Sequence, residues 1–356
     1  MHNILSLDGG GTRGVFSIQI LARMEKLLRQ KYGRPDLVLA DHFDFIGGTS
    51  TGAIIAALLS WGASMETVEN FYLDQSRKVF GRKTWLKRFR FKFHAQELNQ
   101  LLRDYFAEDG RPALLGTPRL RTLYLCVMRN ASTGAPWIIT NSPHAKYNQA
   151  HLADNNLKIP LYQLIRASTA APVFFEPEEI EAGGQNWMFL DGAITPYNNP
   201  AFIMYLTATQ GCFGNNWEDG VDKMRIISVG TGRKRVRFAK LHAADINIGD
   251  QLSHSLLALI DSNNQHQDLL CRAFGRCQWG EPIDTEIGDL ITKEFKESDH
   301  RRFLYCRYNR NLTAEEMKEA EHISDFFSVD SLNGIPFWQK LGRAFAENNV
   351  RIEHLA

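Results

Sequence analysis

The sequence predicts an α/β fold built around a parallel sheet and followed by a mainly helical C-terminal region. Two observations predict it. Within the first 60 of the 356 residues, a short apolar run, a glycine-rich turn and a helical stretch follow one another twice. That order is typical of strands that lie parallel in one sheet, because each helix carries the chain back to the same end. After about residue 240 the sequence becomes more polar, and its periodicity is mostly helical.

The first unit begins with the apolar run 4–7, which predicts a buried strand. The turn Asp8-Gly9-Gly10-Gly11-Thr12-Arg13-Gly14 follows, and apolar residues then recur at the spacing of one helical face. These apolar residues are Val15, Ile18, Leu21, Met24, Leu27 and Leu28. The second unit repeats the pattern with a strand at 43–46, a glycine-rich turn at 47–52 and a helix at 53–59.

Later segments continue the alternation of strands and helices. Apolar runs predict strands at 123–128, 137–140, 188–190 and 226–229. Helical stretches are expected at 63–79, 95–106, 159–167, 249–274, 313–326 and 336–347. We therefore expect a main domain over 1–240 and a mainly helical extension over 241–356, with the boundary placed by the change of character alone.

Composition argues against several classes of protein. The 41 basic side chains balance 40 acidic ones, which argues against a surface built for a nucleic acid polymer. Five cysteines without a C-x-x-C pair predict neither a disulfide framework nor a zinc site, and favour reduced thiols in the cytoplasm. The sequence has no signal-peptide pattern and no apolar run near the roughly 18 residues that span a bilayer, so we expect any membrane contact to be peripheral.

A nucleophile candidate lies in the second glycine-rich turn. Gly48-x-Ser50-x-Gly52 matches the nucleophile-elbow pattern, with the strand before it and the helix after it that the pattern needs. Flanking glycines let the backbone bend sharply at the serine, and the helix N-terminus behind it favours negative charge. By itself the match fits a tight turn without chemical function equally well.

The first glycine-rich turn has three interpretations. Gly9-x-Gly11-x-x-Gly14 fits a dinucleotide-binding loop, although its loose acidic candidate, Asp41, comes late. Asp8–Thr12 also resembles the phosphate loop of sugar kinases, but helical periodicity follows where a second hairpin strand is expected. Consecutive N–H groups over Gly10–Thr12 would alternatively form an anion-binding nest, and hence an oxyanion hole.

A serine nucleophile needs a neighbour that takes its proton. His242, His254 and His266 lie late in the sequence, in polar helical surroundings typical of solvated histidines. Asp191 directly follows the apolar run 188–190, and active sites of parallel sheets lie at the carboxyl ends of strands. Asp191 is the stronger candidate for the base, with a turn cap as the alternative.

Five segments resemble, in order and in context, the motifs of the patatin-like phospholipase family. They are Asp8–Gly14, Gly48–Gly52, Ala167–Phe175, Asp191–Ala193 and Ser228–Gly232. One short motif is weak evidence, whereas five in order are specific. The resemblance covers about residues 2–235. It implies a three-layer fold with a mostly parallel central sheet and helices on both faces.

The resemblance also implies site residues and a reaction. Ser50 would be the nucleophile and Asp191 the general base of a dyad that hydrolyses phospholipid acyl esters through an acyl-enzyme. Backbone N–H groups of Gly10, Gly11 and Thr12 would form the oxyanion hole. Residues that support the motifs would be Gly9, Arg13, Gly14, Gly48, Gly52, Gly192 and Ala193, with Arg13 steadying the loop. No metal and no cofactor are implied.

Basic and aromatic residues alternate between 77 and 93. Within this segment Trp85, Lys87, Arg88 and Arg90 are candidates for membrane contact, because cationic groups attract anionic head groups and rings favour the interface. Packing of the aromatic side on the core and binding of a nucleic acid are the alternatives. A second basic run, 233–237, is suited to a phosphate-bearing ligand or to a solvated surface.

The sequence further resembles bacterial patatin-like effectors of antiphage defence that cyclic nucleotides activate. That resemblance implies a cyclic nucleotide activator, a role of 241–356 in sensing or in homo-oligomer contact, and action from the cytoplasm on the inner face of the membrane. Two other classes stay open. An ATP-dependent sugar kinase would use Asp8–Thr12 but leave Ser50 and Asp191 without roles. A non-catalytic lipid-binding protein is disfavoured because both dyad residues are present.

Overall fold

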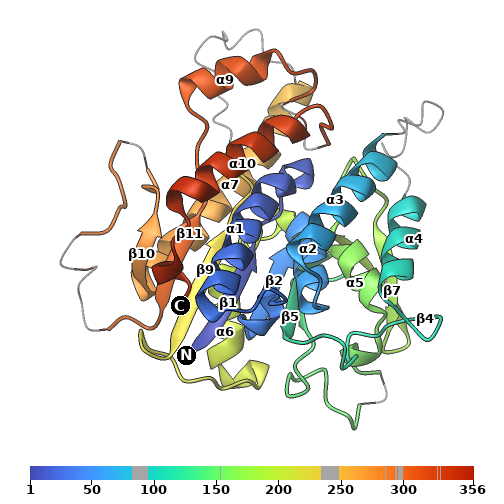
Figure 1. Ribbon diagram of the computed structural model, residues 1–356. Helices are drawn as coiled ribbons and strands as arrows, with labels where there is room; N and C mark the ends of the chain where they lie inside the picture. Colours follow the sequence, from blue (N-terminus) through green and yellow to red (C-terminus); the bar gives the residue numbers. More distant parts are fainter. Residues whose placement is uncertain are drawn as a thin grey trace.

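A computed structural model of the chain describes residues 1–81, 95–152, 154–233, 248–284, 286–292, 295, 300–326, 328 and 330–356. Its centre is a sheet with the strand order β10-β11-β9-β1-β2-β5-β8-β7, and β6 also pairs with β5 (Figure 1). The strands are β1 (His2–Leu7), β2 (Phe45–Thr49), β5 (Leu123–Asn130), β6 (Pro136–Thr140), β7 (Glu178–Ala182), β8 (Gln185–Asp191), β9 (Met224–Val229), β10 (Arg276–Gly280) and β11 (Leu304–Tyr308). Two short strands, β3 (Ala107–Glu108) and β4 (Arg111–Pro112), form a separate hairpin.

Most of the sheet is parallel, as the sequence predicts. Strands β10, β11, β9, β1, β2 and β5 pair in parallel in this order, whereas β6 and β8 pair antiparallel with β5, and β7 pairs antiparallel with β8. Parallel neighbours end at the same edge, so the carboxyl ends of β1, β2 and β9 lie together. Both glycine-rich turns begin at this edge, which brings the two sequence motifs to one place.

Helices cover both faces of the sheet. They are α1 (Gly14–Tyr32), α2 (Thr51–Ser60), α3 (Met65–Phe80), α4 (Ala95–Tyr105), α5 (Leu161–Ser168), α6 (Ala201–Thr209), α7 (Ile248–Phe274), α9 (Ala314–Glu321) and α10 (Ile335–Asn349). Helices α1 and α10 lie side by side on one face (Figure 1). Among the described residues, no helix has the length and apolar character needed to cross a membrane.

Alternate residues of the central strands belong to two separate hydrophobic cores. Leu5 and Ile227 belong to a core that includes residues of α1, α2 and α10, whereas Ile4 and Ile226 belong to a core on the side of α6 and α7. Side chains of a strand alternate between the two faces, so a strand buried on both faces is apolar along its whole length. This explains why apolar runs predicted β1, β5 and β9, and it confirms the three-layer α/β fold. Strand β2 lies at Phe45–Thr49 and not at the expected 43–46, because Gly47 and Gly48 continue the strand where a turn was expected.

The C-terminal region adds two strands to the main sheet. Helices α7, α9 and α10 match the helical prediction, while β11 pairs with β9 and extends the sheet toward β10. The sequence carries only weak strand signals there, because β11 mixes apolar residues with Arg307. The boundary expected at 240 lies outside the described residues and stays a prediction.

Candidate active site

Ser50 stands on a strained turn between β2 and α2. Its backbone has φ 53° and ψ −124°, a conformation that residues with a side chain rarely adopt. The neighbouring chain passes too close for any residue but glycine. A Cβ at Gly48 would lie 2.2 Å from the carbonyl carbon of Gly52, and a Cβ at Gly52 would lie 2.3 Å from the carbonyl oxygen of Leu7. Steric crowding therefore accounts for the Gly-x-Ser-x-Gly spacing.

A buried serine holds the strained backbone. The N–H of Ser50 donates to Oγ of Ser168 at 3.0 Å, and that hydroxyl donates to the carbonyl oxygen of Val127 at 2.6 Å. Ser168 closes α5 and has no exposed surface. The bond gives the N–H of Ser50 a buried partner and so favours the unusual backbone conformation.

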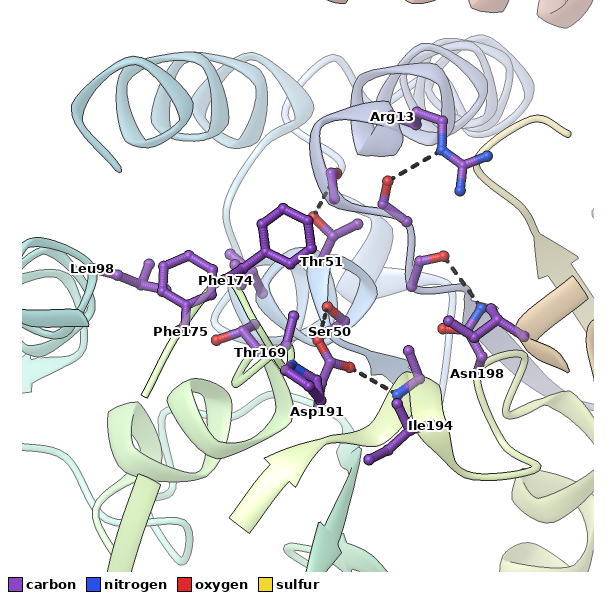
Figure 2. A pocket seen from close by; sticks show the side chains of 18 of the residues that line it. Arg13, Ser50, Thr51, Leu98, Thr169, Phe174, Phe175, Asp191, Ile194 and Asn198 are labelled. Carbon is purple, nitrogen blue, oxygen red and sulfur yellow. Dashed lines mark hydrogen bonds between the residues drawn. The ribbon is translucent and has the colours of Figure 1, made fainter. Parts of the chain in front are cut away.

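The sheet register brings Asp191 to Ser50. On β5, Val127 pairs with Thr49 at the end of β2, and the next residue, Met128, pairs with Asp191 at the end of β8. Oγ of Ser50 donates a hydrogen bond of 2.7 Å to Oδ2 of Asp191 (Figure 2). The other carboxylate oxygen accepts the N–H of Ala193 at 2.8 Å, which fixes the plane of the carboxylate.

Burial sets the basicity of this carboxylate. Asp191 is 2% exposed, and burial raises its pKa from 3.8 to about 6, against the opposing effects of the bonds from Ala193 and Ser50 and of the charge of Arg166. A carboxylate with a higher pKa is a stronger base, and it is still ionised at neutral pH. The site thus has the pairing that proton transfer from a serine hydroxyl needs.

The first glycine-rich turn lies against the same serine. The carbonyl oxygen of Gly9 accepts a hydrogen bond of 3.3 Å from Nδ2 of Asn198. The carbonyl oxygen of Gly10 accepts one of 3.3 Å from Nε of Arg13 (Figure 2). The carbonyl oxygen of Gly11 accepts the hydroxyls of Thr51 and Tyr72, the former at 3.1 Å.

Because the carbonyl oxygens of the turn are hydrogen-bonded to other residues, its N–H groups remain available to a ligand in the cavity. Gly10 and Gly11 line the cavity beside Ser50. In the described part of the chain, their N–H groups have no protein acceptor. An anion next to Ser50 would find such donors in place. Thr12 is buried and is not among the residues that line the cavity, so its part in an oxyanion hole stays a prediction.

The cavity has a volume of about 130 Å³, and its lining is mostly apolar. In Figure 2, Leu98, Phe174 and Phe175 lie on one side of Ser50, and Arg13 and Asn198 on the other. Further apolar lining comes from Ile54, Phe80, Ile194, Leu257 and Ile260. A ligand with an apolar chain and a polar end fits this division.

Other sequence candidates lie elsewhere. His266 is exposed on α7, and His242 and the side chain of His254 lie outside the described residues. Asp41 precedes β2 and pairs with Arg34 and Arg121, whereas a ribose-binding carboxylate follows the second strand. The first turn leads into α1 and not into a hairpin strand, so the sugar-kinase arrangement is absent from this turn.

Two predicted surface segments lie wholly or mostly outside the described residues. Trp85, Lys87, Arg88 and Arg90 all lie outside them, so their membrane contact stays a prediction. Of the second basic run, the structure describes Arg233, whose Nε lies 2.6 Å from Oδ1 of Asp261. Within the described residues, no group of three or more His, Cys, Asp or Glu side chains could hold a metal ion.

Three residues that hold the two turns could not be recognised as site residues from the sequence. Tyr72 and Asn198 hold the first turn, and Ser168 holds the second. Only Ser168 lies in a segment that the sequence singled out, 167–175. Tyr72 belongs to a regular helical face, and Asn198 to a polar loop, so neither had a spacing that distinguished it from ordinary positions.

Comparison with known proteins gives a consistent result. Residues 5–205 match the family model of patatin-like phospholipase. A protein of Vibrio cholerae serotype O1 named cGAMP-activated phospholipase is 27% identical over 351 residues, which cover 92% of this chain and 94% of that protein. A protein of the same name from Escherichia coli strain TW11681 is 32% identical over 56% of this chain and 54% of its own length. Patatin-1-Kuras 2 of Solanum tuberosum is 28% identical over 69% of this chain and 66% of its own length.

Proposed function

The chain belongs to the patatin-like phospholipase family, and we propose that it hydrolyses acyl esters of membrane phospholipids through a dyad of Ser50 and Asp191. One observation carries the proposal. The 2.7 Å hydrogen bond joins a strained serine to a buried carboxylate inside a largely apolar cavity. A lipid acyl hydrolase uses all three features, whereas a non-catalytic lipid carrier needs only the cavity.

The first step is attack of Oγ of Ser50 on the ester carbonyl carbon, while Oδ2 of Asp191 takes the hydroxyl proton. Negative charge then develops on the carbonyl oxygen. Donors from Gly10 and Gly11 stabilise that charge, and one donor of this kind is worth about 3–4 kcal/mol. The alcohol part leaves with a proton returned by Asp191, and the acyl group stays on Ser50.

Water completes the reaction. Asp191 removes a proton from a water molecule, which attacks the acyl carbon. The bond from that carbon to Oγ of Ser50 then breaks, Oγ takes the proton from Asp191, and the fatty acid leaves. The raised pKa of Asp191 makes it a better acceptor than an ordinary carboxylate for the proton of Ser50 and for the proton of water. The acyl chain occupies the side of Leu98, Phe174 and Phe175, so the polar part of the lipid lies toward Arg13 and Asn198.

The proposal is tested with unilamellar vesicles of mixed phosphatidylglycerol and phosphatidylethanolamine. Fatty-acid release is measured for wild type, Ser50→Ala and Asp191→Asn, with p-nitrophenyl butyrate as a soluble second substrate. We expect Ser50→Ala to lower kcat by at least about 10⁴-fold and Asp191→Asn by about 10³-fold or more. Substantial activity in a folded Ser50→Ala variant would contradict the proposal.

A cyclic nucleotide activator belongs to the same proposal. Its support is the relatives named cGAMP-activated phospholipase, the first of which matches nearly the whole chain. We expect cGAMP to raise fatty-acid release from vesicles by at least about tenfold, an effect typical of strong allosteric coupling. Linear pGpA is the matched control. Equal release with and without cGAMP would contradict the activation and leave the hydrolase proposal in place.

A further inference from the structure

A buried ion pair ties the C-terminal region to the first glycine-rich turn. Asp8 directly precedes that turn, and Arg307 lies on β11. Nη1 of Arg307 donates to Oδ1 of Asp8 at 2.8 Å, and Nη2 donates to Oδ2 at 2.5 Å. The two side chains are 4% and 2% exposed. A two-bond contact of this kind fixes direction as well as distance.

The guanidinium is itself held in place. Arg307 pairs with Ser228 across β11 and β9, and Nη1 also donates to that hydroxyl at 2.8 Å. Oγ of Ser228 donates to Oδ1 of Asn199 at 3.1 Å. The guanidinium of Arg307 is therefore held by contacts that involve two strands, β9 and β11, and the buried side chain of Asn199. It has little freedom to move.

The turn that Asp8 starts needs such an anchor. Three successive glycines have the greatest backbone freedom of any sequence, and oxyanion donors act only when they are already oriented. Asp8 anchors the beginning of the turn, and Nη1 of Arg13, at its other end, donates to the carbonyl oxygen of Gly232 at 2.8 Å. Both anchors end on or beside β9, so the turn is clamped to one part of the sheet.

We propose that Arg307 is a positioning residue of the active site, which holds Asp8 so that the N–H groups of Gly10 and Gly11 face Ser50. The inference rests on the proposed function. Arg307 lies outside residues 5–205, the part that matches the family model. The C-terminal region is then part of the catalytic arrangement, beyond its contribution to the core.

Charge and geometry can be separated at this pair. Burial raises the pKa of the Asp8 carboxyl, and the charge of Arg307 opposes that rise. Lysine at 307 would keep the opposing charge but lose the planar fork. A neutral pair, asparagine at 8 and glutamine at 307, would remove both charges together and so avoid an unpaired buried ion. Neither variant keeps the two parallel charged bonds.

The test compares Arg307→Lys and the double variant Asp8→Asn with Arg307→Gln against wild type. Substrate is p-nitrophenyl butyrate, and a fluorophosphonate titrates Ser50 to completion, so kcat is expressed per reactive site. We expect kcat to fall about tenfold or more in both variants, with KM within twofold, because the loss affects only the transition state. Fluorophosphonate should also react about tenfold more slowly.

A second ion pair provides the control. Oε1 of Glu25 lies 2.8 Å from Nη2 of Arg29 on α1, away from the glycine-rich turn. The double variant Glu25→Gln with Arg29→Gln should keep wild-type kcat per site. Wild-type kcat per site in both Arg307 variants would overturn the positioning role and leave Arg307 as a stabilising residue. Absent wild-type hydrolysis, or activity in Ser50→Ala, would overturn the proposed function instead.

Discussion

The two turns of the candidate active site are held by different means. The turn at Ser50 is held mainly by close backbone packing, since Gly48 and Gly52 leave no space for a Cβ, and also by the hydrogen bond from Ser50 to Ser168. The turn at Gly10 is fixed by side chains that reach it from distant parts of the chain, among them Asn198 and Arg307. Close backbone packing dominates at one turn, and side chains from distant segments dominate at the other.

This difference affects how each turn responds to mutation. A change at Gly48 or Gly52 should disturb the fold itself, because a Cβ there would clash with the backbone of neighbouring elements. A change at one support of the Gly10 turn should leave the fold intact and lower the rate, because other supports remain.

Gly48→Ala should prevent stable folding. The new Cβ would meet the carbonyl group of Gly52 at 2.2 Å, a contact that only a shift of β2 or α2 can relieve. We expect the free energy of unfolding to fall by more than about 4 kcal/mol, measured by urea denaturation. Gly33→Ala is the control, because Gly33 has φ 63° and an added Cβ would meet open space. This variant should lose about 1 kcal/mol of the free energy of unfolding. Equal losses would contradict the steric account.

Asp191→Asn should stabilise the protein at high pH while it lowers kcat by about 10³-fold or more. The rise of the pKa from 3.8 to about 6 corresponds to about 3 kcal/mol that the folded state loses by keeping a buried charge. Above pH 6 the carboxylate is ionised in both states, so the neutral variant should be more stable by about 2–3 kcal/mol at pH 8. Between pH 6 and pH 4 the folded carboxylate takes up a proton, and the advantage should disappear.

Urea denaturation at pH 8 and pH 4 measures this difference for wild type and variant. The hydrogen bond from Ala193 can persist with asparagine, so lost bonding should not mask the effect. Equal stability of the two proteins at pH 8 would mean that Asp191 is well solvated, and the argument for its raised basicity would fail.

The sequence predicted the parts of the site that depend on local geometry. Gly48 and Gly52 flank Ser50 at a fixed spacing because backbone groups of Gly52 and of Leu7 leave no room for a Cβ at these two positions. Asp191 was found because an acidic residue directly follows an apolar run. The order of motifs then linked Asp191 to Ser50, although the register that joins them runs through β5.

The residues that support the Gly10 turn could not be predicted in the same way. Arg307 lies 299 positions from Asp8, in a strand whose mixed composition gave a weak signal. Tyr72 fits the apolar face of a helix, and its hydroxyl function depends on where α3 is packed. Such contacts arise from tertiary structure, and neither periodicity nor motif spacing encodes them in one sequence.

Tyr72→Phe should have the smallest effect of the three changes. The buried hydroxyl of Tyr72 donates to the carbonyl oxygen of Gly11, and burial raises its pKa, so it stays protonated as a donor. Thr51 donates to the same oxygen at 3.1 Å and would keep the peptide in place. We expect kcat for p-nitrophenyl butyrate to fall only two- to fivefold, which corresponds to about 0.4–1 kcal/mol.

Removing both hydroxyls should reveal the shared support. In Tyr72→Phe with Thr51→Val, the carbonyl oxygen of Gly11 loses both donors, and its peptide is free to turn so that the N–H leaves the cavity. We expect the double variant to lose more activity than the product of the two single effects, at least about 20-fold, with KM unchanged. Strictly multiplicative effects would mean that the two hydroxyls act independently, and a wild-type rate in the double variant would show that the remaining supports are sufficient to hold this turn.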